Sequence, residues 1–226
     1  MRAKIIAVTN QKGGCGKTNI AVNLAGTMVR RGHKVKLIDA DPQGTATIWV
    51  NNADPDSPIQ IEVNGLGRVA GSVTKEIKKY VDDYDVIIVD CPPAADSPVP
   101  QSMMLVSDLA LIPIIPNPGD LWAAQDILEL ASRCSESNDA LNVRLVASIV
   151  RANLALTKAA LEQMASMREG MPLMKARINQ RAAYAEAMIS GDSVHILGSS
   201  AKAAIEEFEN LTNDVSLVLG LKKGRK

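Results

Sequence analysis

Residues 11–18 combine three glycines with two lysines and a threonine in an order that suits a phosphate-binding loop. Glycines let backbone N–H groups curl around a phosphate, and a helix that begins after them adds free N–H donors. In such a loop Lys17 would reach the outer phosphates of a nucleoside triphosphate, and the Thr18 hydroxyl would ligate magnesium. The alternative, a glycine-rich turn without a ligand, is disfavoured because the Gly-Lys-Thr ending lies between a first strand and a first helix.

Three aspartates follow apolar runs and could complete a magnesium and water site. Asp39 and Asp41 lie one residue apart directly after the run at 35–38, and Asp90 follows the run at 86–89. The carboxyl ends of parallel strands meet at one edge of a sheet, so these carboxylates would face the phosphates. An aspartate in the position of Asp90 commonly holds a magnesium-bound water. Taken singly, each pattern also fits an ordinary turn or the end of a buried strand.

The loop departs from the standard phosphate-binding pattern at its start. Gln11 stands where the standard pattern has its first glycine, and a second lysine, Lys12, precedes the paired glycines. This arrangement resembles the deviant Walker-A motif of the ParA/MinD family of ATPases. The resemblance implies that Lys12 reaches across a dimer to the nucleotide of the other subunit, whereas in isolation Lys12 would be read as a solvated loop lysine.

The resemblance covers nearly the whole chain and implies a role for each site residue. Residues 106–124 resemble the segment that closes over nucleotide in small plasmid-partition ATPases, and residues 176–194 resemble the C-terminal part of ParF-like proteins. Asn19 is a departure, since the family usually has a threonine there that contacts the α-phosphate. The cofactors implied are ATP and Mg²⁺. The implied catalytic residues are Lys12, Lys17 and Asp41; the implied nucleotide contacts are Gly13, Gly14, Cys15, Gly16, Lys17, Thr18, Asn19, Pro118 and Asp120; the implied magnesium ligands are Thr18, Asp39 and Asp90.

Cysteine and histidine are too sparse to indicate a metal or disulfide framework. The chain has three cysteines and two histidines, and no two cysteines are spaced as a metal-binding pair. One member of the family that this chain resembles bridges an iron–sulfur cluster through its cysteines. A cluster-binding or redox role for Cys91 is therefore an alternative. We favour a small buried residue at this position.

The elements that must position these residues alternate along the chain. Near-continuous apolar runs suit strands buried on both faces, and strand–helix alternation predicts a parallel sheet. The 226 residues, 46% hydrophobic and 22% charged, suit one soluble domain. The fold class expected is therefore α/β: a single-domain P-loop NTPase, with a mostly parallel twisted sheet and helices on both faces. Predicted strands are 4–8, 35–38, 59–63, 86–89, 109–115, 145–150 and 173–178; predicted helices are 17–31, 66–81, 121–134, 158–168 and 199–219.

Charge is unevenly distributed although its sum is zero. Residues 141–226 carry 12 Lys/Arg and 8 Asp/Glu, against 25 of each in the whole chain, so this part is basic and the remainder acidic. Basic residues without base-reading companions suit sequence-independent, salt-dependent contacts with DNA phosphates. Solvated charges on helix faces are the plainer interpretation. The resemblance favours double-stranded DNA, with Arg151, Lys175, Arg177 and Arg181 as candidate contacts. An aromatic content of 3% disfavours a stacking platform for single strands.

The function these features predict is that of a ParA-type ATPase. ATP would join two subunits into a DNA-binding homodimer, and hydrolysis, stimulated by a ParB-like or other adaptor, would release them. The cargo positioned over the nucleoid would be a plasmid first, with a chromosome or a protein organelle such as the carboxysome as further possibilities. We expect a cytoplasmic, nucleoid-associated protein with an ATPase domain at 1–221 and a basic tail at 222–226.

The competing class is a membrane-cycling ATPase resembling MinD. Residues 215–226 carry leucines and terminal lysines that could form an amphipathic anchor. The segment lacks Trp and Phe, and Gly220 would weaken its helix. The spacing of Ile205, Phe208, Leu211, Val215 and Val218 instead predicts the core face of a packed terminal helix, so no membrane partner is expected. A metal or cluster loader, a third class, is disfavoured by the cysteine count.

Overall fold

The computed structural model describes residues 2–66, 73–93, 97–151, 155–222 and 224. Their strands form one seven-stranded sheet in the order β3-β2-β4-β1-β5-β6-β7. Every adjacent pair in this order is parallel, which confirms the predicted fold class. The strands are β1 (Lys4–Val8), β2 (Val35–Asp39), β3 (Glu62–Gly65), β4 (Val86–Asp90), β5 (Leu109–Ile114), β6 (Asn142–Val150) and β7 (Leu173–Asn179).

The strand register brings the chemically interesting strand ends together. β1 lies in the middle of the sheet between β4 and β5, and its last residue, Val8, is opposite Asp90. On the other side of β4, Asp39 is opposite the same Asp90. The phosphate-binding loop follows β1 directly, so the register places it beside both aspartates.

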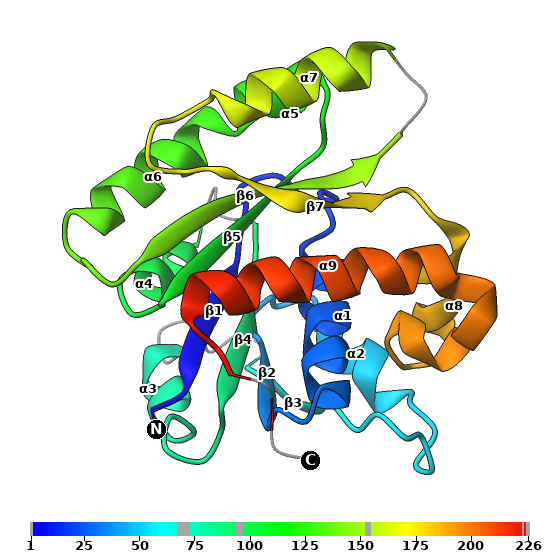
Figure 1. Cartoon of the computed structure of the whole chain (residues 1–226). Coiled ribbons are helices and arrows are strands. Elements are labelled where there is room, and N and C mark those ends of the chain that lie inside the picture. The colour runs from blue at the N-terminus through cyan, green and yellow to red at the C-terminus, as the bar shows by residue number, and fades with distance from the viewer. Residues whose placement is uncertain (1, 67–72, 94–96, 152–154, 223, 225–226) are drawn as a thin grey trace.

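One face of the sheet is covered by helices that include the one following the phosphate loop. They are α1 (Lys17–Arg30), α2 (Thr45–Asn51), α8 (Ala182–Ile189), the 3₁₀ segment η3 (Val194–Ala201) and α9 (Lys202–Leu219). Figure 1 shows α9 lying across this face next to α1. The five residues predicted as the core face of the terminal helix all pack into the core here. Gly26 of α1 permits a close approach, because a Cβ there would lie 2.4 Å from the Ser193 Cβ.

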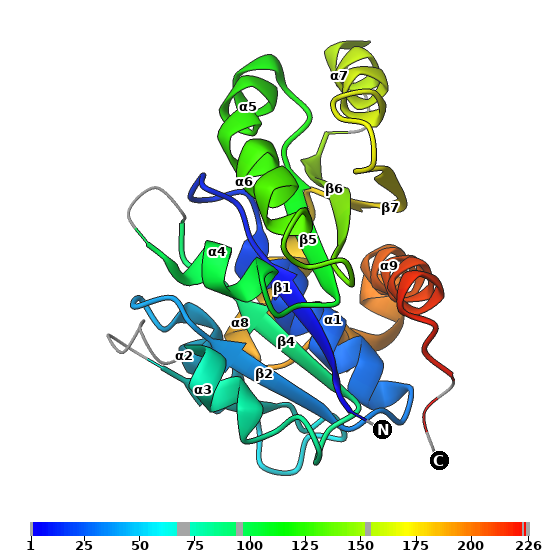
Figure 2. The same ribbon diagram turned by 90° about the vertical axis from the view of Figure 1, so that its left-hand side faces the viewer.

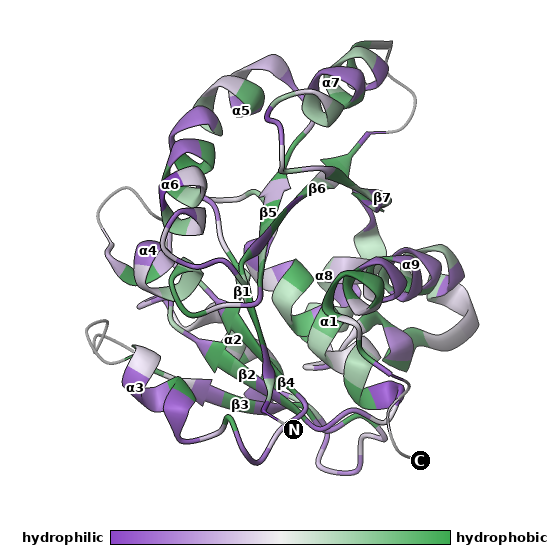
Figure 3. Ribbon diagram, turned by 60° about the vertical axis from the view of Figure 1, so that its left-hand side comes forward, coloured by the Kyte–Doolittle hydropathy of each residue, from purple (hydrophilic) through white to green (hydrophobic). Residues whose placement is uncertain are grey.

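The opposite face is covered by five further helices among the described residues. They are α3 (Val73–Lys78), α4 (Val99–Met104), α5 (Pro118–Ala123), α6 (Gln125–Ser135) and α7 (Ala155–Ala165). Figure 2 shows the sheet between the two sets, and Figure 3 shows hydrophobic and hydrophilic residues alternating along the helices, as amphipathic helices require. Within the described residues, no helix has the length and apolar composition needed to cross a membrane.

Several predicted boundaries were wrong. The helix predicted at 66–81 is only α3, preceded by β3, and residues 67–72 lie outside the described part. The strand predicted at 59–63 begins and ends later, because its pairing with β2 runs from Glu62 to Gly65. The helix predicted at 121–134 is split into α5 and α6, and Asn117 caps the earlier start with its side chain. The helix predicted at 158–168 starts and ends three residues earlier, and the one predicted at 199–219 is divided into η3 and α9. No pattern in the sequence predicted α2, α4 and α8, which have eight residues or fewer.

Candidate nucleotide-binding site

The loop between β1 and α1 has the backbone of a phosphate cradle. Gly14 (φ 73°) and Gly16 (φ 88°) adopt left-handed conformations that other residues rarely take, and α1 begins at Lys17 with no side chain capping its first N–H groups. A Cβ at Gly13 or Gly14 would meet open space, so no described residue packs against the loop at these two positions. The buried Cys15 is held from below, because the Ser148 hydroxyl donates to its carbonyl over 2.7 Å.

Lys17 and Lys12 point in different directions from this loop. The Lys17 side chain is buried and folds into the loop, where its Nζ donates to the Lys12 carbonyl over 3.0 Å. The Lys12 side chain is 45% exposed, and its Nζ lies 2.7 Å from Oδ1 of Asp120, whose own side chain is only 7% exposed. Asp120 belongs to α5, and Asn117 donates a further hydrogen bond to its carboxylate. Pro118 occupies the first turn of the same helix.

Thr18 and Asp90 form a pair at the floor of the site. The Thr18 hydroxyl donates to Oδ2 of Asp90 over 2.7 Å, while Oδ1 of Asp90 is buried and has no hydrogen-bond partner among the described residues. Burial, followed by the nearby charge of Asp39, raises the pKa of Asp90 to about 7. A buried acceptor without a partner beside a threonine hydroxyl fits a hydrated Mg²⁺, which prefers oxygen ligands and keeps several waters.

Asp39 and Asp41 occupy different environments. Asp39 is fully buried, and its two oxygens accept backbone hydrogen bonds from Asp41 (3.1 Å) and from Thr47 at the start of α2 (2.8 Å). Asp41 is half-buried, and its Oδ1 accepts from the backbone N–H of Gln43 over 2.9 Å. Asp39 therefore shapes the loop that presents Asp41, and Asp41 is the more accessible of the two carboxylates.

A pocket of about 290 Å³ opens beside the phosphate loop. Gly16 contributes from the phosphate loop and Asn19 and Ile20 from α1, while the ends of β6 and β7 and the start of α8 form the opposite wall. Sequence reasoning missed most of this lining. Ile149 in that wall has φ 51°, an outlier for a β-branched residue, and such strain clusters at functional sites. The remaining lining residues are Ser148, Ile149, Ile178, Asn179, Gln180, Arg181, Tyr184 and Ala185.

The predicted DNA-contacting residues are brought to the β6–β7 end of the sheet but differ in availability. Lys175 and Arg177 occupy exposed positions of β7, alternating with buried Met174, Ala176 and Ile178. Arg151 follows β6 and is exposed, and its Nε donates to Gln180 over 2.8 Å. Arg181 instead forms an ion pair with Glu207 at 2.6 Å.

The thiols of the three cysteines have no role in the nucleotide chemistry described above. Cys15, Cys91 and Cys134 are buried free thiols, and burial raises the pKa of all three, which agrees with a packing role for Cys91. In the described part of the chain, no group of three or more His, Cys, Asp or Glu residues could hold a metal ion.

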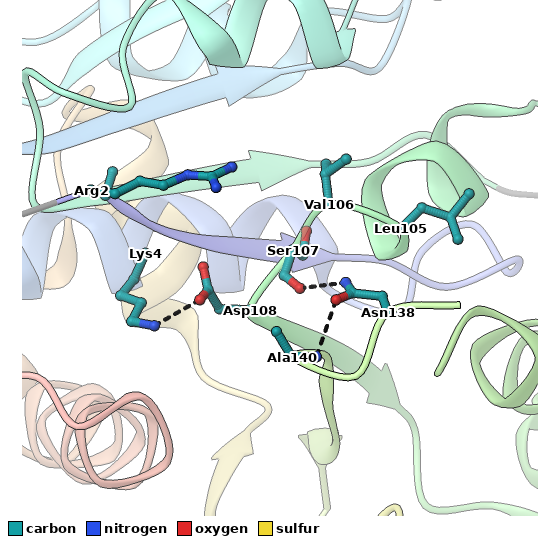
Figure 4. Close-up of a pocket in the computed structure, with 9 residues that line it drawn as sticks. Arg2, Lys4, Leu105, Val106, Ser107, Asp108, Asn138 and Ala140 are labelled. Carbon is teal, nitrogen blue, oxygen red and sulfur yellow. Dashed lines mark hydrogen bonds and ion pairs between the residues drawn. The ribbon is translucent and has the colours of Figure 1, made fainter. Parts of the chain in front are cut away.

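The second pocket, of about 310 Å³, lies at the amino ends of β1 and β5, away from the phosphate loop. Figure 4 shows that its polar groups other than Arg2 pair with one another: Lys4 lies 2.7 Å from Asp108, and Asn138 bonds to Ser107 and Ala140. These mutual contacts leave the pocket without an evident chemical role.

Comparison with known proteins places this geometry in context. The family model described as "CobQ/CobB/MinD/ParA nucleotide binding domain" matches residues 6–194. The chain is 34% identical over 214 residues, covering 95% of it and 97% of the relative, to "Maintenance of carboxysome distribution protein A" of Halothiobacillus neapolitanus. It is 28% identical to "Protein ParA" of Rhizobium radiobacter over 91% of this chain and 92% of that protein.

Solved structures share the fold. A variant of McdA from Cyanothece in complex with ATP has a TM-score of 0.78 at 18% identity and covers 100% of this chain and 99% of its own. The septum site-determining protein MinD of Pyrococcus horikoshii with Mg-ADP has a TM-score of 0.76 at 20% identity, covering 96% of this chain and 98% of its own.

Proposed function

The chain belongs to the CobQ/CobB/MinD/ParA nucleotide-binding family, and from this premise we propose that it is a ParA-type ATPase whose ATP-bound dimer binds DNA and positions a cargo over the nucleoid. The observation that carries this proposal is the pair of lysines in one glycine-rich loop, of which Lys17 points inward and Lys12 outward. The relative from Halothiobacillus neapolitanus, named for maintenance of carboxysome distribution, favours a protein organelle of that kind as the cargo, ahead of a plasmid.

Hydrolysis requires a positioned triphosphate, a positioned water and stabilised charge. The loop N–H groups and Lys17 would bind the phosphates, and Asp41 would orient the attacking water from its accessible carboxylate. Thr18 and Asp90 would hold Mg²⁺, which supplies charge neutralisation on the phosphate oxygens. Asp39 would act by holding the Asp41 loop, since backbone N–H groups engage both of its oxygens.

The base and ribose would enter the pocket beside Asn19. Its walls of Ile20, Ile149 and Ile178 are apolar, and its position next to Gly16 continues the phosphate loop. Largely apolar pockets with a few polar groups are the usual form of small-molecule sites.

Dimerisation would require Lys12 to leave Asp120. In the described conformation the ion pair holds Lys12 against its own chain. An ATP-bound partner would offer phosphate oxygens in place of this carboxylate, and Lys12 would supply the cation that acts across the interface. An adaptor that stimulates hydrolysis would act on this assembled site.

The test is ATP-dependent association and DNA binding of the purified protein. We expect light scattering to show dimers with Mg-ATP and monomers with ADP, and the Lys12→Ala variant to remain monomeric while still binding ATP. Lys75→Ala, which removes an exposed lysine of α3, is the matched control and should dimerise normally. A Lys12→Ala protein that dimerises like the unaltered chain would contradict the proposal.

Membrane cycling is the second candidate, since Leu217 is 83% exposed on α9. Leu219 and Leu221 pack against the core, however, which leaves little of this segment to enter a bilayer. Sedimentation with anionic liposomes, with ATP and with ADP, separates the two candidates: ATP-dependent liposome binding without DNA binding would favour the membrane class.

A further inference from the structure

The ion pair between Lys12 and Asp120 joins a fixed carboxylate to a side chain that solvent reaches. The Asp120 side chain is 7% exposed, whereas that of Lys12 is 45% exposed. Asn117 holds Asp120 from two directions: its side-chain amide donates to the carboxylate, and its Oδ1 accepts from the Asp120 backbone N–H over 3.0 Å. Of the two partners, only the lysine side chain is therefore free to turn away.

The backbone beneath Lys12 is tied to the same part of the sheet as Asp120. The buried Asn10 accepts from the Lys12 N–H over 3.1 Å, and its amide donates to the carbonyl of Pro113 over 2.6 Å. Pro113 belongs to β5, the strand that precedes α5 and Asp120. Both ends of the ion pair are thus anchored near the end of β5, and the pair can open by rotation of the Lys12 side chain while the backbone stays in place.

Opening this pair has a cost that falls on Asp120. Its Oδ1 is the oxygen that contacts Lys12, and this atom accepts no hydrogen bond from the described residues, since the Asn117 amide donates to Oδ2. A carboxylate buried to this degree is destabilising when its counter-charge is removed. Lys12 therefore stays with Asp120 until an acceptor of greater negative charge, such as a triphosphate on a second subunit, competes for it.

We infer that Asp120 is a positioning residue that holds Lys12 on its own subunit and so sets the ATP concentration at which two subunits associate. This inference rests on the proposed function, in which Lys12 acts across the dimer. Its new content is the sign: the carboxylate opposes association, so removing it strengthens the dimer. Each dimer opens two such pairs, so the effect of one pair on the dissociation constant is squared.

The first test asks whether Asp120 restrains Lys12 in the nucleotide-free protein. Acetic anhydride acylates lysine nitrogens, and mass spectrometry gives the rate at Lys12 relative to the exposed Lys75 of the same molecule. The nitrogen must leave the carboxylate to react, so we expect Asp120→Asn to raise this relative rate about threefold, the size of a partly exposed ion pair. Asp126→Asn, which removes an exposed carboxylate of α6, is the matched control and should leave the rate unchanged.

The second test measures association itself, by analytical ultracentrifugation with increasing Mg-ATP. A threefold effect per subunit gives about a tenfold lower dissociation constant for the Asp120→Asn dimer. Asp120→Glu, which keeps a carboxylate, should show a smaller gain, and Asp126→Asn should show none. In the double variant Lys12→Ala/Asp120→Asn the gain should vanish, whereas a gain that came from altered packing of α5 would persist without Lys12.

The outcomes separate this inference from the proposed function. Unchanged acylation of Lys12 in Asp120→Asn, or association that is unchanged or weaker than that of the unaltered chain, would overturn the inference; weaker association is the result expected if Asp120 instead contacts the nucleotide within the dimer. If neither the unaltered chain nor Asp120→Asn associates with Mg-ATP, the proposed function fails together with its regulation, even where acylation shows that the ion pair exists.

Discussion

Asp90 shows how a single residue can serve a site at a cost to the fold. Its carboxylate is almost completely buried, one oxygen lacks a partner among the described residues, and Asp39 adds a like charge nearby. We predict that Asp90→Asn raises the free energy of unfolding by about 1–3 kcal/mol, because an amide is less costly to bury than a charge. The same change should remove the Mg²⁺ dependence of ATP binding.

Thermal unfolding of the nucleotide-free protein and Mg²⁺ titrations of ATP binding measure these two effects. Asp82→Asn, at an exposed position, should change neither. A destabilised Asp90→Asn protein would show that the carboxylate is paired in a way that the geometry does not reveal.

His195 gives a second prediction at the residue scale, on pH. Its Nε2 lies 3.0 Å from Oγ1 of Thr27, whose hydroxyl already donates to the Asn23 carbonyl, so the imidazole is the donor. Burial lowers the pKa of His195 below the usual 6.5. The charged groups around it are Glu209 and Asp192, which oppose the shift, and Arg30 and Arg31, which add to it.

The sign of the pH effect follows from this direction. The folded protein protonates His195 less readily than the unfolded chain does, so its contribution to stability is complete above about pH 6.5 and is lost as pH falls through the lower, folded pKa. We predict that His195→Gln flattens the decline of the free energy of unfolding below about pH 6.5, measured by urea denaturation. Burial also lowers the pKa of His33. His33→Gln should therefore also reduce the loss of the free energy of unfolding at acidic pH.

The sequence predicts site residues where a local motif carries them. Lys12, Lys17 and Thr18 lie within a few positions of one another, so the motif alone is enough to predict that they act together. Asn179 and Glu207 are 28 positions apart, and their contact depends on how α9 packs against β7. The periodicity of the sequence does not reveal such a long-range contact. For this reason the wall of the pocket at the ends of β6 and β7 was not predicted.

At the scale of elements, α1 depends on a glycine, although glycine has a low helix propensity. A Cβ at Gly26 would lie 2.4 Å from the Ser193 Cβ. We predict that Gly26→Ala destabilises the protein by about 1–3 kcal/mol, the usual effect of overpacking, although alanine is the better helix former. Gly119→Ala in α5 is the matched control, since its new Cβ would lie 3.7 Å from Asn117. Chemical denaturation of both variants measures the contrast, and equal effects would contradict the steric explanation.

Strands were predicted better than helices for a physical reason. β1, β2 and β4 are buried along nearly their whole length, so their apolar runs stand out from the flanking sequence. α2 and α4 have two turns or fewer, and such short helices are held by tertiary packing more than by their own periodicity.

For the whole molecule, the distribution of available cations predicts how DNA binding would respond to salt. Lys175, Arg177 and Arg151 are exposed, whereas Arg181 is paired with Glu207. The logarithm of the affinity falls as the logarithm of the salt concentration rises. We predict that removing any of the three exposed cations makes this negative slope shallower by about 0.9 per lost phosphate contact, and by twice that in a dimer. Arg181→Ala should act mainly through nucleotide binding.

Fluorescence anisotropy with a nonspecific duplex and Mg-ATP, at several salt concentrations, measures these slopes. Lys75→Ala, on α3 beside β2 and β4 and so at the other end of the sheet from β7, is the control and should leave the slope unchanged. Equal slopes for all of these variants would place the DNA-binding surface elsewhere.

The central position of β1 has a consequence for how the molecule comes into being. Its two neighbours in the sheet pair Lys4 with Val86 and Ile6 with Leu109, so during synthesis this strand must wait for segments about a hundred residues downstream. At usual rates of synthesis that wait lasts roughly 5–20 s. During it, an apolar strand has no partner and can pair with other nascent chains. Folding is then a late event dominated by non-local contacts, and the yield of active protein depends on what shields that strand in the interval.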